Sequence, residues 1–340
     1  MTHADLLAVP SDRRTAIEQL APHLRPGLRV ALTTHINADG DGCGSEAALA
    51  HLLTAHGMHP YIVNPTPWPS LFAFLLGGPV VNRSPEGAAA LRECDLLLVL
   101  DISDVRRLGN LTDTVRGLTV PKLTIDHHQP ADEPPGPVMV SDVRACATGE
   151  LVFDVAQVMN LEIGPEAARG IYVALLTDTG SFRFSNTSPR CHAIAATLLA
   201  RGLDPEDMYR RIYASSPLGK LKLLGEALAT LESDGDLGVA WISIPAEALD
   251  QHGVTGEDLD GIVEHARSVA GTRLALFFRD LGHGKVKVSF RSTGDVDVNR
   301  FARQFGGGGH ARAAGALLPG SLEEVRERVV EAAREFVRRD

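Results

Sequence analysis

Cysteine is scarce in this sequence and too dispersed to build a disulfide framework or a thiolate metal site. The 340 residues include only four cysteines, at positions 43, 94, 146 and 191, and no two of them form a C-x-x-C pair. Disulfide-rich scaffolds and zinc-ribbon sites both need clustered cysteines. We therefore expect isolated, reduced thiols and a cytoplasmic protein.

Long apolar runs are absent as well. The longest runs, such as LLLVL at residues 96–100, are far shorter than the roughly 20 residues that a membrane-spanning helix requires. The first 20 residues lack the basic stretch followed by an apolar core that marks a signal peptide. We therefore expect no membrane association and no secretion signal.

Positive charge is in the minority, with 33 Lys and Arg against 43 Asp and Glu and a formal net charge of -10. This balance argues against a protein that coats nucleic acid by bulk electrostatic attraction, but it allows a small anionic substrate. A content of 44% apolar and 22% charged residues is typical of a soluble globular protein. The length favours one large domain and a smaller one.

Short apolar runs alternate with longer helical patterns in the first half of the chain. Strands are predicted at residues 28–34, 59–64, 95–101, 122–126 and 136–142. Several of these runs are apolar throughout, as in a parallel sheet that is covered on both faces. Helices are predicted near residues 43–57, 147–160, 165–177 and 190–201. The alternation predicts a doubly wound α/β domain with a mainly parallel sheet.

A polar stretch with two prolines then separates this block from a different one. We expect a first domain over 1–203, a linker over 204–224 and a smaller α/β domain with a mixed sheet over 225–340. Strands of the smaller domain are predicted at residues 237–244, 272–280 and 285–292, the last two joined as a hairpin. A final amphipathic helix begins with a capping box of Ser321 and Glu324.

His35, Asp39 and Asp41 follow the first predicted strand, in the segment HINADGDG. Open α/β sheets bind ligands at such strand ends, and the neighbouring glycines allow a tight turn. A dinucleotide-binding fingerprint would need glycine where Ser45 stands, and two aspartates would repel a pyrophosphate unless a cation intervened. The segment is therefore either a metal site or a solvated turn.

Acids and histidines also close three other buried elements. Asp101 ends one predicted strand, Asp126, His127 and His128 end another, and Asp178 ends a long helical run. Each alone could be a turn former or a surface residue, but parallel strands point these ends at one edge of the sheet. Histidine and carboxylate ligands favour Mn²⁺ or Mg²⁺ over a thiolate-type zinc site, and their number favours two ions.

Four motifs, HINADGDG, VLDISD, DHH and TDTGSF, occur in the order that is typical of the DHH phosphoesterase superfamily, which this chain resembles. The segment FGGGGHARAAG at 305–315 looks like the glycine-rich signature of the first type of DHH-associated domain. The resemblance spans 35–315 and points to the NrnA-like branch of oligoribonucleases and phosphoadenosine-phosphate phosphatases. Ala38 departs from the pattern, since many members have proline before the first aspartate.

The resemblance implies two divalent cations, with Mn²⁺ favoured over Mg²⁺, and a set of residues that bind them. The implied metal ligands are His35, Asp39, Asp41, Asp101, His127 and Asp178. Asp101 would bridge the two ions and His128 would contact the substrate phosphate, so that both act in catalysis. Asp126 would orient a ligand histidine, as such acids commonly do.

The glycine run before His310 has two interpretations, a flexible loop or a backbone that approaches an anion or base closely. It is not a Walker loop, because no Lys-Ser/Thr pair follows it. Residues 271–315 carry eight Lys or Arg against three acids, which favours contact with a phosphate chain. The predicted substrate-binding residues are Arg183, Arg291, Gly307, Gly308, His310 and Arg312, together with His128.

These patterns predict a metal-dependent phosphoesterase that releases nucleoside monophosphates from very short oligonucleotides, RNA or DNA. The resemblance extends the expected substrates to 3′-phosphoadenosine 5′-phosphate and to linear or cyclic dinucleotides. It also implies that the protein forms a homodimer, as many family members do. Three alternatives remain, namely an inorganic pyrophosphatase, a RecJ-type exonuclease and a non-catalytic nucleotide sensor. The missing Ser-Arg-Lys-type motif argues against a pyrophosphatase, and the missing additional nucleic-acid-binding domain argues against a RecJ-type exonuclease. The intact ligand set argues against a non-catalytic sensor.

Overall fold

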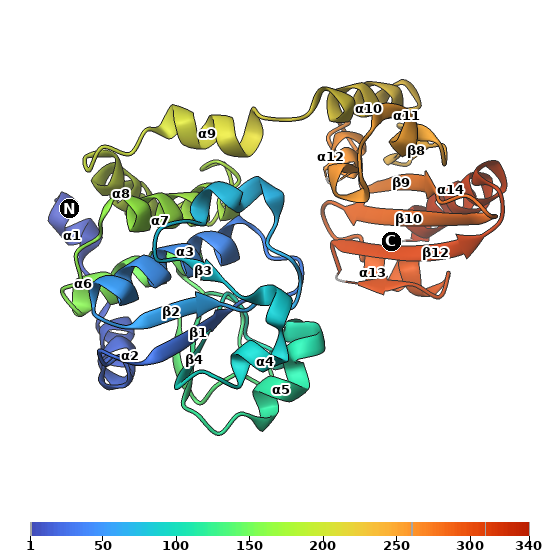
Figure 1. Cartoon of the computed structure of the whole chain (residues 1–340). Coiled ribbons are helices and arrows are strands. Elements are labelled where there is room, and N and C mark those ends of the chain that lie inside the picture. Colours follow the sequence, from blue (N-terminus) through green and yellow to red (C-terminus); the bar gives the residue numbers. More distant parts are fainter. Residues whose placement is uncertain (1, 260, 310, 340) are drawn as a thin grey trace. The chain divides into compact units, whose positions relative to one another are not determined.

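The computed structural model describes residues 2–259, 261–309 and 311–339, and the chain divides into two compact units between Ala214 and Ser215 (Figure 1). The stretch expected to be a linker contains helix α9 (Pro205–Tyr213) of the first unit and the start of helix α10 (Leu218–Ala229) of the second.

The first unit is built around a parallel six-stranded sheet with the order β3-β2-β1-β4-β5-β6. Its strands are β1 (Arg29–Thr33), β2 (His59–Ile62), β3 (Val81–Asn82), β4 (Leu96–Leu100), β5 (Lys122–Asp126) and β6 (Val138–Ser141). The doubly wound α/β prediction is confirmed, and only the two-residue β3 is too short to leave a periodic signal. The strand order reverses between β1 and β4, which is where such sheets bind ligands.

Helices cover both faces of this sheet, which explains why its central strands are apolar throughout. Val30 and Leu32 of β1 join a core with α2, α3, α6, α7 and α8, whereas Ala31 joins a second core with α4 and α5. The helices of the first unit besides α9 are α1 (His3–Leu7), α2 (Ser11–Leu20), α3 (Gly40–Ala55), α4 (Ala88–Leu91), α5 (Thr112–Gly117), α6 (Thr148–Val158), α7 (Pro165–Asp178) and α8 (Pro189–Leu199). Short 3₁₀ helices are η1 (Ala21–His23), η2 (Ser70–Leu75), η3 (Ser84–Glu86) and η4 (Val105–Leu111).

Helices α3 and α7 approach each other closely through glycine. A Cβ atom on Gly44 would lie 2.4 Å from the carbonyl oxygen of Gly170, and one on Gly170 would lie 2.5 Å from the carbonyl oxygen of Gly44. Gly40 likewise lies against the side chain of Thr177. These contacts bring the beginning of α3 to the end of α7, where Asp178 stands.

The second unit contains a mixed sheet with the order β11-β12-β10-β9-β8-β7, in which only β8 and β9 are parallel. Its strands are β7 (Glu232–Asp234), β8 (Val239–Ile244), β9 (Leu274–Asp280), β10 (Lys285–Ser292), β11 (Gly308–Gly309) and β12 (Ala313–Pro319). The predicted mixed sheet and its hairpin are confirmed. Strands β7, β11 and β12 were not predicted, because β7 has only three residues and glycine and alanine give no strand signal.

The remaining helices of the second unit cover both faces of this sheet, α10 and α12 on one and α13 and α14 on the other. Besides α10 they are α11 (Ala248–His252), η5 (Gly256–Leu259), α12 (Ile262–Arg267), α13 (Val298–Arg303) and α14 (Leu322–Arg339). The capping box of α14 is present, since the Ser321 amide donates to Glu324 Oε2 at 3.0 Å and the Glu324 amide donates to Ser321 Oγ at 3.3 Å. Among the helices described, none is long and apolar enough to span a bilayer.

Gly44→Ala should lower the free energy of unfolding of the first unit by about 1–3 kcal/mol, because the added methyl group forces α3 and α7 apart. The measurement is equilibrium urea denaturation followed by circular dichroism. Gly225→Ala in α10 is the matched control. No atom lies within 4 Å of a Cβ at Gly225, so this change should stabilise its helix by about 0.5–1 kcal/mol. Equal effects of the two changes would contradict the close-contact explanation.

Candidate metal centre

The first two predicted ligands lie between β1 and α3. His35 is 5% exposed, and its ring Nδ1 lies 2.9 Å from the carbonyl oxygen of Ile36. Asp39 caps α3, because its Oδ1 accepts hydrogen bonds from the amides of Asp41 and Gly42 at 3.0 and 3.1 Å. Asp39 Oδ2 is left 3.8 Å from His35 Nε2. Asp39 therefore caps α3 with one carboxylate oxygen and presents the other to the site.

Asp101 stands directly after β4 and lies between two histidines. Its backbone φ is +62°, a left-handed conformation that Asp tolerates better than most residues but that still costs about 1–3 kcal/mol. One carboxylate oxygen, Oδ2, lies 3.4 Å from His35 Nε2, and the other, Oδ1, lies 3.6 Å from His127 Nε2. The two oxygens of this buried carboxylate thus face different groups of ligands.

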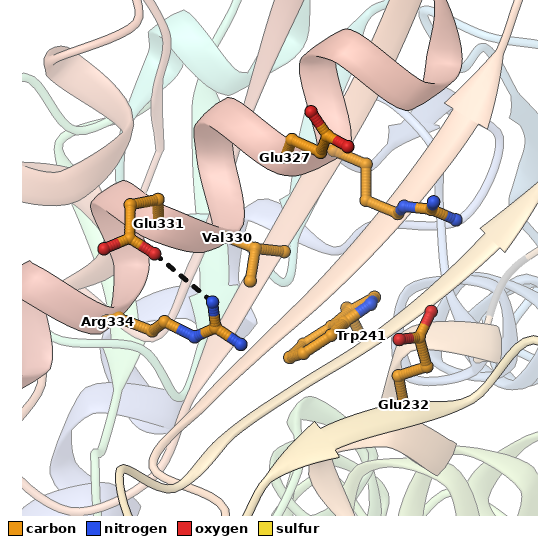
Figure 2. A pocket seen from close by; sticks show the side chains of 7 residues that line it. Glu232, Trp241, Glu327, Val330, Glu331 and Arg334 are labelled. Atoms are coloured by element: carbon orange, nitrogen blue, oxygen red, sulfur yellow. Dashed lines mark hydrogen bonds and ion pairs between the residues drawn. The ribbon is translucent and has the colours of Figure 1, made fainter.

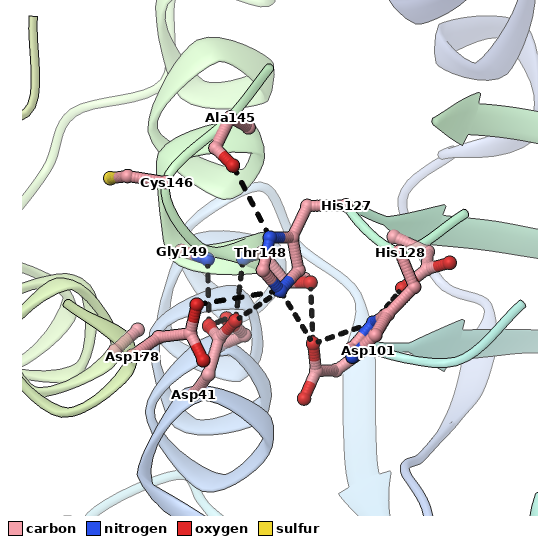
Figure 3. Close-up of polar contacts among 12 residues, drawn as sticks. Asp41, Asp101, His127, His128, Ala145, Cys146, Thr148, Gly149 and Asp178 are labelled. Atoms are coloured by element: carbon pink, nitrogen blue, oxygen red, sulfur yellow. Dashed lines mark hydrogen bonds and ion pairs between the residues drawn. The ribbon is translucent and has the colours of Figure 1, made fainter. Parts of the chain in front are cut away.

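His127 gathers the second group of acids (Figure 3). Its Nε2 lies 3.5 Å from Asp41 Oδ2 and 3.7 Å from Asp178 Oδ2. The other ring nitrogen, Nδ1, lies 3.2 Å from the carbonyl oxygen of Ala145, which orients the ring so that Nε2 faces the acids.

Asp126 contacts a different histidine from the one expected. Asp126 Oδ1 lies 2.8 Å from Nδ1 of His128, whereas His127, the predicted ligand, is held by the Ala145 carbonyl instead. Asp126 therefore orients His128, which was predicted to contact the substrate phosphate, and not the predicted ligand His127. The hydrogen bond raises the pKa of His128, whose Nδ1 also lies 3.6 Å from Asp101 Oδ1.

The predicted ligands thus come together within the first unit. Within the described parts of the chain, three overlapping groups could each hold an ion, with ligand atoms within 4.8 Å of one another. These groups are His35 with Asp39 and Asp101, Asp41 with His127 and Asp178, and Asp101 with His127 and His128.

The site is short of positive charge. Burial raises the pKa of Asp41 well above its usual range, and the nearby carboxylates of Asp101 and Asp178 add to the effect. Burial also raises the pKa of Asp178 to about 6 despite the nearby His127. Although burial opposes it, the carboxylates of Asp101 and Asp39 raise the pKa of His35 to about 10.

Two histidine nitrogens in the site also lack partners. Nε2 of His35 and Nε2 of His127 are buried without a hydrogen bond, and both face the acids. Neutral imidazole and carboxylate groups are the ligands that divalent cations such as Mn²⁺ accept. The residues present therefore fit a divalent-cation site.

The segment Ala145–Gly149, which ends in the first turn of α6, was not predicted to belong to the site. The amides of Thr148 and Gly149 donate to the two oxygens of Asp41 at 2.6 and 3.0 Å, and Thr148 Oγ1 donates to Asp101 Oδ1 at 2.9 Å. Asn186 Nδ2 bonds the carbonyl of Cys146 and Asp178 Oδ2. Every residue except proline has a backbone N–H group, so residue type does not reveal which amides donate to a ligand. The only signal in the sequence was the ATG run at residues 147–149, at the start of a helical pattern.

The predicted substrate-binding residues lie in both units. Arg183 of the first unit is exposed, and its Nε donates to the carbonyl oxygen of Gly180 at 2.6 Å. In the second unit, Arg291 Nε pairs with Glu264 at 3.3 Å and Arg312 Nη1 donates to the carbonyl of Val296 at 3.4 Å.

The glycine run of the second unit is closely packed. Gly308 lies in β11, and a Cβ on Gly307 would lie 2.1 Å from the carbonyl oxygen of Gly315, so this position requires glycine. His310, also predicted to bind substrate, lies outside the described residues.

The second unit also contains a pocket of about 370 Å³ beside Trp241 (Figure 2). Arg334, which lies over the Trp241 ring, is paired with Glu331 and Asp234. Two carboxylates in and beside the pocket, those of Glu331 and Asp234, therefore already have a cation. Unlike the histidine and aspartate groups of the first unit, the residues that line this pocket include none of the groups that could hold a metal ion among the residues described.

Comparison with known proteins matches both parts of the chain to known domain families. Residues 29–177 match the DHH family, N-terminal domain, and residues 237–339 match the DHHA1 domain. A bifunctional oligoribonuclease and PAP phosphatase NrnA from Thermus thermophilus is 32% identical over 311 residues, which are 91% of this chain and 90% of that protein. The Bacillus subtilis protein of the same name is 29% identical, over 85% of this chain and 89% of that protein.

Two solved structures share the fold. An exopolyphosphatase-related protein from Bacteroides fragilis has a TM-score of 0.85 and 26% identity, with 96% of this chain and 98% of that chain covered. RecJ from Thermus thermophilus in complex with Mn²⁺ has a TM-score of 0.53 and 18% identity, covering 98% of this chain and 56% of RecJ, so that this likeness concerns the fold alone. The predicted resemblance is thus confirmed, and the chain belongs to the DHH family, with a DHHA1 domain after its DHH domain.

Proposed function

We propose that this protein is a metal-dependent phosphoesterase that degrades very short oligonucleotides to nucleoside monophosphates and dephosphorylates 3′-phosphoadenosine 5′-phosphate. The observation that carries the proposal is the position of Asp101, whose two oxygens face His35 and His127 in two different ligand groups. Relatives named for both activities match most of the chain and support the choice of substrates. Linear and cyclic dinucleotides belong to the same substrate class.

Two divalent cations, Mn²⁺ in preference to Mg²⁺, would be held by His35, Asp39, Asp41, Asp101, His127 and Asp178. When bound, such ions supply positive charge to the phosphate oxygens and lower the pKa of water. Asp101 is the shared ligand in this proposal. The surplus of carboxylates over histidines in the site supports cations that prefer oxygen ligands.

His128 is the proposed catalytic side chain outside the ligand set. Because Nδ1 faces Asp126, a proton on this ring nitrogen is fixed, and the raised pKa favours the doubly protonated ring. The side chain is 39% exposed, so it is accessible to a substrate. We assign it to stabilise charge on the phosphate and to donate a proton to the leaving oxygen.

The second unit is proposed to bind the rest of the substrate. The register of β10 and β12 places Arg291 opposite Ala313, next to Arg312, and Gly308 of β11 opposite Gly315. Two arginines and an exposed glycine backbone therefore lie near one end of the sheet. This combination suits phosphate oxygens, which accept from guanidinium and backbone N–H groups. Arg183, His310 and the backbone of Gly307 are proposed contacts as well.

The alternatives are separated by one assay. Metal-stripped protein, with Mn²⁺ added back, is offered a labelled dinucleotide, a five-mer, 3′-phosphoadenosine 5′-phosphate and pyrophosphate side by side. Preference for pyrophosphate would favour an inorganic pyrophosphatase, and cleavage of long strands only would favour a RecJ-type exonuclease. Binding without turnover would favour a nucleotide sensor. A cytoplasmic location and a homodimer stay predictions.

Asp101→Asn should reduce hydrolysis of the dinucleotide more than about a hundredfold, the upper end of the loss seen for residues that only orient a ligand. Asparagine preserves the size of the side chain and tolerates positive φ, so the protein should stay folded by circular dichroism. The measurement is turnover at saturating Mn²⁺. Asp104→Asn is the control, because Asp104 caps η4 and asparagine caps equally well. Undiminished turnover of Asp101→Asn would count against the assignment.

Arg291→Met and Arg312→Met should each raise the KM for a five-mer about tenfold, a loss of about 1.4 kcal/mol, because a charge-assisted hydrogen bond to phosphate is removed. Hydrolysis of a small artificial phosphodiester, bis(p-nitrophenyl) phosphate, should be nearly unchanged. Arg338→Met, at an exposed position of α14, controls for loss of charge. Equal losses on both substrates would refute the separate roles of the two units.

A further inference from the structure

The first turn of α6 contacts both ligand groups of the metal centre at once. Thr148 donates its amide to Asp41 Oδ2 at 2.6 Å and its hydroxyl to Asp101 Oδ1 at 2.9 Å (Figure 3). Asp41 belongs to one group that could hold an ion, and Asp101 belongs to the others. Thr148 is fully buried, so water does not compete for these bonds.

The hydroxyl of Thr148 selects the orientation of the shared carboxylate. It bonds Oδ1 of Asp101, the oxygen that faces His127, and leaves Oδ2 facing His35. Rotation of the carboxylate would break this bond. Nε2 of both histidines is buried and has no hydrogen-bond partner among the residues described. The space between these atoms and the acids is therefore where cations would bind.

The first turn of α6 is itself held rigidly from behind. The amide of Cys146 donates to Glu150 Oε2 at 3.1 Å, and Glu150 Oε1 pairs with Arg13 Nη1 at 2.8 Å and with Arg190 Nε at 3.2 Å. A Cβ on Gly149 would lie 2.4 Å from that of Ala174 in α7, so α6 also packs tightly against the helix that ends in Asp178. The donor groups of Thr148 are therefore fixed in place before any ion binds.

We propose that Thr148 is a positioning residue that holds the Asp101 carboxylate with one oxygen toward His35 and the other toward His127, the arrangement on which cation binding would depend. The inference rests on the proposed function for its activity readout, but its binding readout is independent of turnover. Outer hydrogen bonds of this kind typically change metal affinity about 10–100-fold.

The test compares Thr148→Val, which removes the hydroxyl at nearly constant volume, with Thr148→Ser, which keeps it. Calorimetric titration of metal-stripped protein with Mn²⁺ measures the number of ions and each affinity. Thr148→Val should bind at least one ion about tenfold more weakly and need more Mn²⁺ for half-maximal turnover, whereas Thr148→Ser should match the wild type. If Thr148→Val fails to fold by circular dichroism, Thr148→Ala supplies the same comparison.

Thr112→Val is the matched control, because Thr112 is also buried and its hydroxyl donates one hydrogen bond, to the carbonyl of Val105. Wild-type Mn²⁺ affinities in Thr148→Val, or equal losses in Thr112→Val, would overturn the inference. A wild-type protein that binds Mn²⁺ but cleaves none of the substrates would refute the proposed function alone. A wild-type protein that binds no Mn²⁺ would overturn the inference as well.

Discussion

The burial of mutually repelling carboxylates is the constraint on which the rest of this structure depends. Asp41 and Asp101 are each 1% exposed, and together with Asp178 they face one another around His127. Charges taken out of water are costly unless they are paired and hydrogen-bonded. The chain supplies part of the compensation through histidines and backbone donors, and the raised pKa values of Asp41 and Asp178 show that this part is incomplete. A site of this kind is suited to cations.

The fold meets this constraint with rigid elements rather than with long flexible side chains. The reversal of strand order between β1 and β4 brings His35 and Asp101 to the same edge of the sheet. Glycine contacts between α3 and α7 place the start of one helix at the end of the other. Behind the site, the first turn of α6 is anchored by Arg13 and its buried carboxylate partners. Each ligand side chain is therefore short and fixed by the backbone that carries it, and those of His35, Asp41 and Asp101 are buried.

Much of this could be predicted from the sequence, because apolar strands that end in acids leave a strong pattern. The strands from β1 to β6, except β3, and the clustering of the predicted ligands follow from that pattern and from the rule that parallel strands end at one edge. The sequence did not indicate which histidine Asp126 contacts. Both histidines lie 3.6 Å from Asp101 Oδ1, but Asp126 reaches His128 and not His127, and the sequence alone did not reveal which neighbour each would find.

The sequence by itself determined the chemistry of the site, since residue types fix which atoms can bind an ion, and it determined which elements carry them. Only the tertiary structure decided how those atoms are oriented. The Ala145 carbonyl, the amides of Thr148 and Gly149 and the Thr148 hydroxyl all act on ligands that lie 18 to 108 positions away in the chain. Backbone groups are the same in every residue, so their partners are set by packing and not by composition.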